Sequence, residues 1–464
     1  MRALWRCVLV ATAMSGSYAP ALLIDLLRPR ASADDPALGL FSPFMPTVPK
    51  VAFWAVLCGW AVAAIAAAAT AAVPALRPGR TPIGQLTVLG TLVMSLAVWP
   101  VHVMATNLPE LLLVVPTTAA GLWFAHRSQR HHRMPGRLLL GAFAWGALPA
   151  IGLAGAMNTL YLDYAPAYLQ EAGNLLYLHN RVYAGAAFHA GFVEEAAKGA
   201  GVAIALLLFR RHTAGMVSGI ALGAAVGLGF NFTESIEYLS SATGSAAGFQ
   251  HWMRQTVGLM AAHTAFSAVL GAGLGLASQM DRTRGRAFVV TCGFLAAAGS
   301  HAASNVVFRW YGQIGADLVG AGPAVDTVLM SPVVLILVQG PCVLMVALLL
   351  RHGLREQAEG IADVLLAEAR SGTGTVTPVE VPMLIVPARR FWLRVTLLRR
   401  AGRDAYRAVV AVQRAQLTLA THQWLSSQGR VPPDPAEEHR LRVRILRRRT
   451  RQAELLSAVG VTGR

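Results

Sequence analysis

Apolar runs of about 20 residues recur through the first 350 residues of the chain, separated by short polar stretches. A run of this length matches the helix that is needed to cross the apolar core of a bilayer. The pattern therefore predicts an all-α, polytopic helical membrane protein with about ten transmembrane helices. Their predicted positions are residues 7–27, 51–73, 84–104, 108–126, 138–158, 185–209, 214–238, 257–277, 287–308 and 327–350.

Composition agrees with this class, because 55% of the 464 residues are hydrophobic and only 14% are charged. Arg2 and Arg6 precede the first span, which could therefore be a cleaved signal peptide. We favour an uncleaved anchor. The four cysteines are isolated from one another and form no CxxC or Cys/His pattern, which argues against a disulfide framework or a thiolate zinc site.

The distribution of basic residues predicts the orientation of the chain in the membrane. Loops on the cytoplasmic side of a membrane protein carry an excess of lysine and arginine. If ten spans leave both termini inside, 15 basic residues near the spans lie inside and six lie outside. We therefore expect a multi-pass protein of the cell (plasma) membrane with both termini in the cytoplasm.

The segment after the last predicted span is a basic helical tail. Residues 352–464 hold 19 arginines against 10 acidic residues, and the helical composition breaks at the Gly/Thr/Pro-rich stretch 371–387. Beyond it, Phe391 and Trp392 lie among arginines, a pattern typical of helices that contact anionic lipid headgroups. A solvated tail is the alternative. No nucleic-acid-binding motif is present, so no nucleic acid partner is expected.

Four of the predicted spans carry polar residues on faces that are otherwise made of small residues. Ionisable groups within a membrane are costly and usually face the interior of the bundle. Small residues at four-residue spacing also let helices approach closely. The polar positions are Glu194, Glu195 and Lys198 in span 185–209, Glu234 and Tyr238 after Phe230 in span 214–238, His263 and Ser267 in span 257–277, and His301 and Asn305 in span 287–308. Their depths all fall in the outer half of the bilayer, so we expect them to converge.

Such a cluster supports a limited range of chemistry. An ionised glutamate beside trapped water can act as a general base, and histidine or asparagine can donate hydrogen bonds to an oxyanion. Two histidines with one or two glutamates can also hold a divalent zinc ion with one open position. Ser267 is not a credible nucleophile, because no third group orients it within its helix, and we expect it to bond its own backbone or a neighbouring helix.

Structural and non-catalytic interpretations of the same residues stay open. Glu194 and Lys198 could be an ion pair that fixes helix register, Glu234 could reach toward the interface, and the histidines could join helices by hydrogen bonds. A proton-coupled transporter also uses buried Glu, Lys and His, although no internal repeat is visible. A non-catalytic receptor or immunity protein is a further alternative.

The four motifs taken together resemble the PrsW family of intramembrane proteases, within the wider group of CAAX prenyl proteases and bacteriocin-processing proteins. The matching residues are Glu194-Glu195-Ala-Ala-Lys198, Phe230-Asn-Phe-Thr-Glu234-Ser-Ile-Glu-Tyr238, His263 and His301-Ala-Ala-Ser-Asn305. The resemblance covers roughly residues 137–310. It implies an intramembrane endopeptidase of the metallo- or glutamate type that cleaves a single-pass or membrane-anchored protein, for example an anti-sigma factor.

The resemblance also implies roles for individual residues. Either Glu194 or Glu195 would be the base, Lys198 would orient the pair, and Asn305 would support the oxyanion. Glu234, His263 and His301 would complete the water site, or would hold Zn²⁺ or another divalent metal if the protein is a metal enzyme. The domains predicted on this basis are N-terminal spans at 1–136, a protease core of about five spans at 137–310, a final span at 311–350 and the cytoplasmic basic tail at 351–464.

Overall fold

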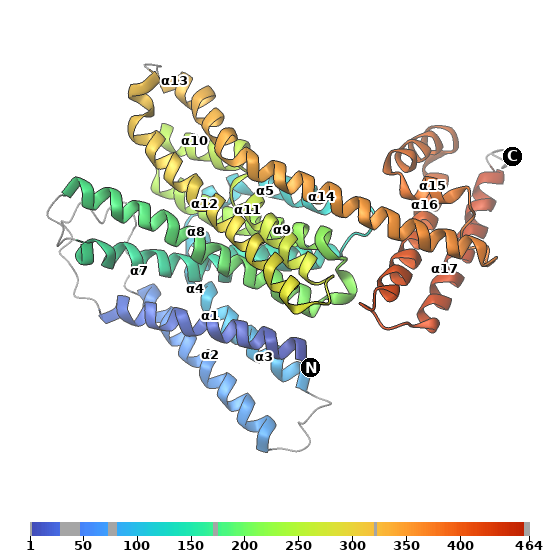
Figure 1. Cartoon of the computed structure of the whole chain (residues 1–464), viewed down its shortest axis with the longest axis horizontal. Coiled ribbons are helices and arrows are strands. Elements are labelled where there is room, and N and C mark those ends of the chain that lie inside the picture. Colours follow the sequence, from blue (N-terminus) through green and yellow to red (C-terminus); the bar gives the residue numbers. More distant parts are fainter. Residues whose placement is uncertain (1, 28–46, 73–80, 170–174, 320–322, 459–464) are drawn as a thin grey trace. The chain divides into compact units, whose positions relative to one another are not determined.

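A computed structural model describes the chain at residues 2–27, 47–72, 81–169, 175–319 and 323–458. Within these ranges every regular element is helical, which confirms the all-α class (Figure 1). The α-helices are α1 (Arg2–Leu27), α2 (Thr47–Ala72), α3 (Thr81–Met94), α4 (Val98–Thr106), α5 (Leu108–Ser128), α6 (Gly136–Trp145), α7 (Ile151–Leu169), α8 (Leu175–Leu208), α9 (Gly215–Ser241), α10 (Ser245–His251), α11 (Ala262–Ala277), α12 (Thr283–Val319), α13 (Pro323–Val325), α14 (Ser331–Arg370), α15 (Glu380–Ile385), α16 (Pro387–Ser427) and α17 (Pro435–Ala458). Short 3₁₀ or π segments are η3 (Ser95–Ala97), η4 (Gly146–Ala150), η6 (Arg210–His212), η7 (Trp252–Val257) and η8 (Asp326–Met330).

The described part of each predicted span is mostly helical, although residues 258–261 of the span 257–277 form a turn. In the described part of the chain, seven helical stretches are long and apolar enough to cross a membrane. They are Val88–Thr106, Leu108–Ser128, Gly136–Ala165, Gly215–Ser241, Ser245–Ala277, Thr283–Gly312 and Asp326–Arg370. The other three predicted spans coincide with α1, α2 and α8. The protein is therefore a polytopic helical membrane protein.

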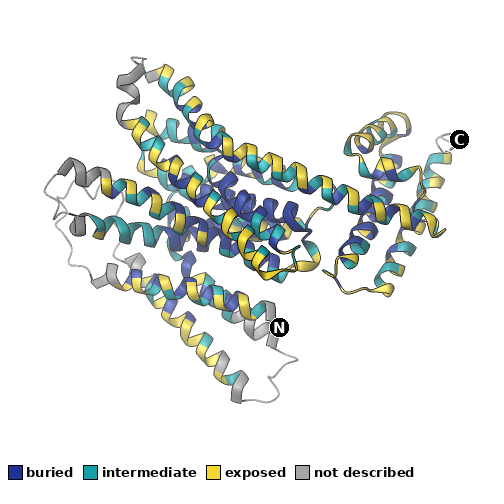
Figure 2. Ribbon diagram, viewed as in Figure 1, coloured by how far each residue is buried: buried dark blue, intermediate teal, exposed yellow. Residues whose placement is uncertain are grey.

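Helix α9 lies at the centre of the bundle, where its apolar stretch is entirely buried by other parts of the protein (Figure 2). It packs along α11 through backbone contacts. A Cβ atom added to Gly219, Gly223 or Gly227 would lie 2.0–2.2 Å from a backbone oxygen of α11. Because only glycine leaves room for this approach, the small-residue face of α9 sets the distance between the two helices.

The described residues of segment 159–184, between two predicted spans, are helical, and the position of the segment outside the cell stays a prediction. Helix α7 continues to Leu169 and α8 begins at Leu175. The 34 residues of α8 extend for about 51 Å, longer than a bilayer core of about 30 Å, so part of the helix projects beyond it. The predicted external loop at 28–50 lies mostly outside the described residues.

The chain divides into two compact units. The first comprises residues 1–126, 135–209 and 215–349, and the second comprises 127–134, 210–214 and 350–464. Most of each of the three predicted membrane domains lies in the first unit, whereas residues 127–134 and 210–214 belong to the second. The limits between the domains stay a prediction. The second unit has a core of its own, in which Ile361, Leu365 and Trp424 are buried with Val381 and Leu384 from the predicted break at 371–387.

The second unit is tied together by a buried carboxylate. Glu368, at the end of α14, receives two hydrogen bonds of 2.9 Å from Arg442 on α17, and further bonds from Thr373, Thr375 and Gln423. These bonds join four segments of the unit around one acid. The tail is therefore a folded structure.

Candidate active site

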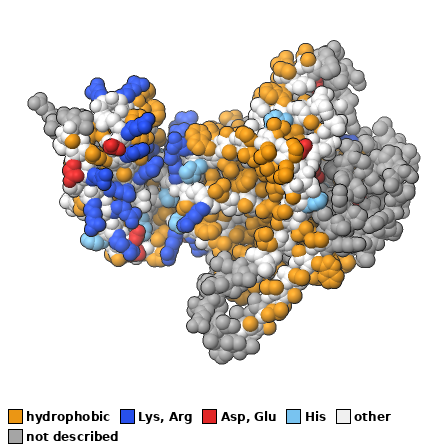
Figure 3. Space-filling model, turned by 180° about the vertical axis from the view of Figure 1, so that it is seen from behind, with side chains coloured by type: hydrophobic (Ala, Val, Ile, Leu, Met, Phe, Trp, Pro, Cys, Tyr) orange, Lys and Arg blue, Asp and Glu red, His pale blue; other side chains and the backbone are white. Residues whose placement is uncertain are grey.

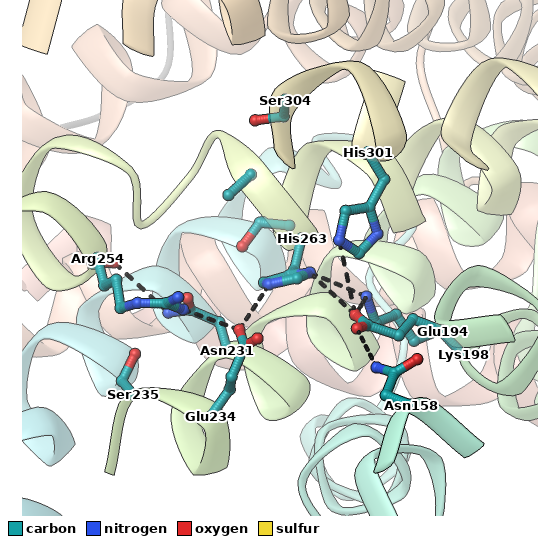
Figure 4. A network of polar contacts seen from close by, with 12 residues as sticks. Asn158, Glu194, Lys198, Asn231, Glu234, Ser235, Arg254, His263, His301 and Ser304 are labelled. Carbon is teal, nitrogen blue, oxygen red and sulfur yellow. Dashed lines mark hydrogen bonds and ion pairs between the residues drawn. The ribbon is translucent and has the colours of Figure 1, made fainter. Parts of the chain in front are cut away.

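The polar residues of four helices meet inside the bundle (Figure 4). They are Glu194, Glu195 and Lys198 on α8, Glu234 on α9, His263 on α11 and His301 on α12. The side chain of Glu234 is 16% exposed, whereas the other five residues are between 0% and 7% exposed. Six of the seven predicted site residues therefore converge, and the distances below describe how.

Lys198 is the centre of the cluster. Its Nζ lies 2.8 Å from Glu195 Oε1, 2.9 Å from His263 Nδ1 and 3.3 Å from Glu194 Oε2. It also lies 3.8 Å from the centroid of the Phe230 ring. An ammonium group has three N–H donors, and these three acceptors use all of them. Lys198 is therefore placed to hold the other residues rather than to bind a substrate.

Glu195 is fully engaged by the protein. Its Oε1 accepts hydrogen bonds from Lys198 and from His301 Nδ1, the latter at 3.2 Å, and its Oε2 accepts one of 3.0 Å from Ser267. The residue is 0% exposed. The Ser267 contact confirms the expectation that this hydroxyl bonds a neighbouring helix.

Glu194 is less fully engaged. Its Oε1 accepts a hydrogen bond of 3.0 Å from Asn158 Nδ2 on α7. Its Oε2 lies 3.6 Å from His301 Nε2 and 3.8 Å from His263 Nδ1, which is too far for hydrogen bonds. Oε2 accepts one hydrogen bond, of 3.3 Å from Lys198. One lone pair of this oxygen therefore remains for a water molecule or an ion between the carboxylate and the two imidazoles.

Asn158 is itself held in place. Its Oδ1 lies 3.2 Å from His189 Nδ1, and the His189 ring stacks on Tyr161 with 4.9 Å between centroids. These contacts orient the amide so that its Nδ2 donates to Glu194.

Glu234 joins the cluster through His263. Its Oε2 lies 2.7 Å from His263 Nε2 and 2.8 Å from Arg254 Nη1. The Arg254 guanidinium, which comes from η7, also stacks 3.7 Å from the centroid of the Tyr238 ring. A proton on His263 Nε2 suits this arrangement, because it is donated to Glu234 and leaves Nδ1 as the acceptor for Lys198.

His301 is oriented in the same way by Glu195. With a proton on Nδ1 donated to Glu195, its Nε2 faces Glu194. The ring stacks on Phe266, with 5.2 Å between centroids. Each histidine therefore has one nitrogen fixed by a carboxylate, an arrangement common around hydrolytic and metal sites.

Glu194, His263 and His301 each offer a ligand atom, and these atoms lie within 4.8 Å of one another. Two imidazoles and one carboxylate are a donor set that suits zinc. The metal ligands predicted from the sequence were Glu234, His263 and His301. The Glu234 carboxylate, however, is bonded to Arg254 Nη1 and to His263 Nε2. The Lys198 amine already donates to His263 Nδ1, so ligation through that atom requires the amine to move.

Three carboxylates face two cations in this network, since Glu194, Glu195 and Glu234 are balanced only by Lys198 and Arg254. With both histidines neutral, the net formal charge is −1. A buried negative charge stabilises an added cation, which is either a proton on a histidine or a metal ion.

Asn305 lies apart from this network. It is exposed one turn after His301, whereas the adjacent Ser304 is buried and accepts a 2.9 Å hydrogen bond from Gln339. No interaction found among the described residues joins Asn305 to the cluster. Its predicted role at the oxyanion stays a prediction.

Sequence reasoning missed two members of the network. Asn158 is the last residue of the predicted span 138–158, and Arg254 was placed in an external loop. Two features of the sequence pointed to these residues. Asn158 is a lone amide at the end of an apolar span, and Arg254 is a single arginine shortly before the helix of His263. Neither feature shows which side chain the residue contacts, because that depends on how the helices pack.

Comparison with protein families places these residues in a known group. Residues 134–338 match the model of the PrsW family, described as intramembrane metalloproteases, and all six converging residues lie within this range. Comparisons with curated proteins and with solved structures gave no match. The match confirms the resemblance of the four motifs. The part of the chain that holds the six converging residues is therefore similar to the PrsW family of intramembrane metalloproteases.

Proposed function

We propose that the protein hydrolyses a peptide bond of a membrane-anchored protein, with Glu194 as the general base that activates water. The observation that carries this proposal is the difference between the two adjacent glutamates. Glu195 accepts three hydrogen bonds and is 0% exposed. Glu194 accepts two, is 5% exposed, and its Oε2, which accepts the bond from Lys198, also faces His263 and His301 at 3.6–3.8 Å. Of the two acids, Glu194 is the better placed to accept a proton from a water molecule between these groups.

The reaction steps follow from this arrangement. Glu194 takes one proton from water while the water oxygen forms a bond to the carbonyl carbon of the substrate. The carbonyl oxygen becomes an oxyanion, and protonated His301 donates to it from Nε2, because Glu195 stabilises the imidazolium through Nδ1. The C–N bond then breaks, and the proton held by Glu194 passes to the leaving amine.

A divalent metal fits the same residues. Glu194, His263 and His301 would hold it, and when bound it would act as a Lewis acid toward the scissile carbonyl. The description of the family as metalloproteases supports this possibility. The Lys198 amine would then still donate to Glu194 and Glu195 but would lose its hydrogen bond to His263 Nδ1.

The substrate class follows from the position of the site. The cluster lies within a helix bundle, on elements whose predicted depth is in the outer half of the bilayer. We therefore infer a single-pass or membrane-anchored protein substrate that is cut near the outer surface of the cell membrane. An anti-sigma factor is one candidate of this class.

The exposed residues of the tail favour a contact between the tail and the membrane surface, in addition to the membrane-spanning helices. Phe391 and Trp392 are 58% and 63% exposed on α16, next to Arg389 and other arginines. Exposed aromatic and basic residues on one helix favour contact with anionic lipid headgroups. We infer that the tail lies against the cytoplasmic surface.

Cleavage by the purified full-length protein in proteoliposomes tests the hydrolytic proposal. A set of reporter single-pass proteins serves as substrate, and cleaved bonds are identified by mass spectrometry. We expect Glu194→Gln to lower the rate by about 100- to 10,000-fold, the usual contribution of a general base. Glu110→Gln, which removes a partly buried carboxylate from α5, is the matched control and should keep the wild-type rate. Wild-type cleavage by Glu194→Gln would rule out this mechanism.

The same preparation separates the two hydrolytic types. If a metal is required, a chelator abolishes cleavage, zinc or another divalent ion restores it, and His301→Ala lowers the metal content of the protein. If the glutamate alone suffices, cleavage continues in chelator and still depends on Glu194.

A further inference from the structure

A second cluster of ionisable groups lies in the second unit, where α16 folds back on itself. Gly402 has φ 80°, which breaks the helix. Arg394 Nε donates a 2.7 Å hydrogen bond to Gln413 Oε1, although 19 residues of straight helix would separate them by about 28 Å. Residues 387–401 therefore pack against the second half of α16, and this brings their arginines next to Arg414.

The buried member of the cluster is Arg390. It is only 6% exposed, and its Nη2 donates a 2.9 Å hydrogen bond to the backbone oxygen of Arg130, in segment 127–134 of the same unit. Burial and then the neighbouring Arg394 and Arg133 lower the pKa of Arg390 to about 10. A buried guanidinium is ordinarily paired with an acid.

No acid is paired with these arginines. Among the described residues, no aspartate or glutamate lies within ion-pair distance of Arg133, Arg390, Arg394 or Arg414. Burial and neighbouring arginines also lower the pKa of Arg133 and of Arg394. At neutral pH these four arginines are positively charged and lie near one another. Their mutual repulsion costs free energy, which a bound anion would offset. Arg133 and Arg414 are exposed, so the place is open to a ligand.

His131 adds a second, independent feature. The residue is 8% exposed, and its buried Nδ1 has no hydrogen-bond partner among the described residues. Burial and then the charges of Arg390 and Arg130 lower the pKa of His131 to about 4, so the ring is neutral at pH 7. A neutral imidazole can still donate one hydrogen bond to an anion. A buried imidazole nitrogen with an unused hydrogen-bonding capacity, beside arginines that no acid pairs with, suits the binding of an anion.

We propose that His131, Arg133, Arg390, Arg394 and Arg414 form a binding site for a phosphate group. Guanidinium groups match phosphate oxygens in charge and in geometry. Figure 3 shows that basic side chains gather over the tail helices, whereas much of the other visible surface is hydrophobic. The phosphate belongs either to the headgroup of an anionic phospholipid or to a soluble phosphate compound. The site is independent of the hydrolytic cluster.

Thermal unfolding of the purified full-length protein in detergent tests this site. The probes are inorganic phosphate and pyrophosphate against sodium chloride of equal ionic strength, and short-chain phosphatidylglycerol against phosphatidylcholine. The test variants are R390Q/R394Q and, because its residues are exposed, R133Q/R414Q. The control is R407Q/R440Q, which removes the same charge from two exposed arginines that are paired with Asp404 and Glu437.

We expect a phosphate probe to raise the Tm of the wild type and of the control with saturation. Both test variants should bind it about tenfold more weakly or worse, because each loses charged hydrogen bonds. R390Q/R394Q without ligand should be at least as stable as the wild type, since repulsion is relieved. A response to phosphatidylglycerol alone assigns a lipid headgroup, and a response to phosphate or pyrophosphate alone assigns a soluble compound. The proposal is overturned if the phosphate probes raise the Tm no more than the matched salt and phosphatidylcholine do. It is also overturned if the control R407Q/R440Q loses as much affinity as the test variants.

Discussion

At the scale of single residues, the site depends on the balance of charge around Lys198. Its ammonium is 0% exposed and lies between two carboxylates. Removing one partner of a buried ion pair leaves an uncompensated charge and costs about 3–5 kcal/mol. We expect Lys198→Met to lower the free energy of unfolding by about that amount, measured by denaturant unfolding in detergent.

The double variant Lys198→Met/Glu195→Gln is the control for this prediction. It removes one positive and one negative charge from the same buried place, so it should recover a large part of the lost stability. Equal stability of Lys198→Met and the wild type would show that the three groups do not share charge in the folded protein.

A second prediction concerns Asn158, which holds the proposed base. Asn158→Ala removes a hydrogen bond to a carboxylate, a contact of about 1.5–3 kcal/mol. We expect kcat/KM, measured on a cleaved reporter, to fall by about 10- to 100-fold, and the free energy of unfolding to fall by no more than about 1.5–3 kcal/mol. Asn107→Ala, which loses hydrogen bonds to the Val103 backbone oxygen and to Thr106 Oγ1 and none to the cluster, should keep the wild-type rate. An unchanged rate in Asn158→Ala would contradict the assignment of Glu194.

The difference between predicted and missed residues has a physical cause. Glu194, His263 and His301 could be predicted because an ionisable group in an apolar span has few roles outside a polar interior. Their exact partners could not, because the rotation of each helix sets which atoms meet. Thus His301 is buried while Asn305, one turn later, is exposed. Arg254 was beyond reach for the same reason, since its role depends on where Glu234 lies.

At the scale of elements, the spacing between α9 and α11 controls the site. A Cβ on Gly227 would lie 2.2 Å from the backbone oxygen of His263, so any side chain there pushes the two helices apart. We expect Gly227→Ala to lower both the Tm and the rate of cleavage, because His263 would move away from Glu234. Gly299→Ala on α12, where nothing lies within 4 Å, is the matched control and should be neutral or stabilising. Equal behaviour of the two variants would show that this contact does not hold the site.

Helix positions could be predicted from apolar length, but helix ends could not. The bilayer fixes how many apolar residues a span needs and places no limit on how far a helix continues into water. Helix α7 therefore continues to Leu169, beyond the predicted span 138–158, and α8 begins at Leu175, before the predicted span 185–209. The break at Gly402 was also missed, since a single glycine inside a helical pattern does not reveal a positive φ.

At the scale of the whole molecule, the composition of the second unit tests the predicted number of membrane spans. It gathers segments 127–134, 210–214 and 350–464, which follow the fourth, sixth and tenth predicted spans. Segments after even-numbered spans lie on one side of the membrane, and a hydrogen bond from Gln357 to the Ala214 backbone oxygen joins two of them directly. The fold and the count of ten spans therefore agree with each other.

The side on which these segments lie is the last prediction. Arginines resist transfer against the membrane potential, which opposes each charge by about 2.3 kcal/mol per 100 mV. Since 15 of the 21 basic residues near the spans fall on the side of the tail, that side should be the cytoplasm. We expect green fluorescent protein fused after residue 464 to fluoresce and alkaline phosphatase fused there to be inactive. Alkaline phosphatase inserted at Gly244, an exposed turn between α9 and α10, should be active, because this turn follows the seventh span. The reverse pattern would place the tail outside the cell and would move the cluster of Glu194 to the inner half of the bilayer.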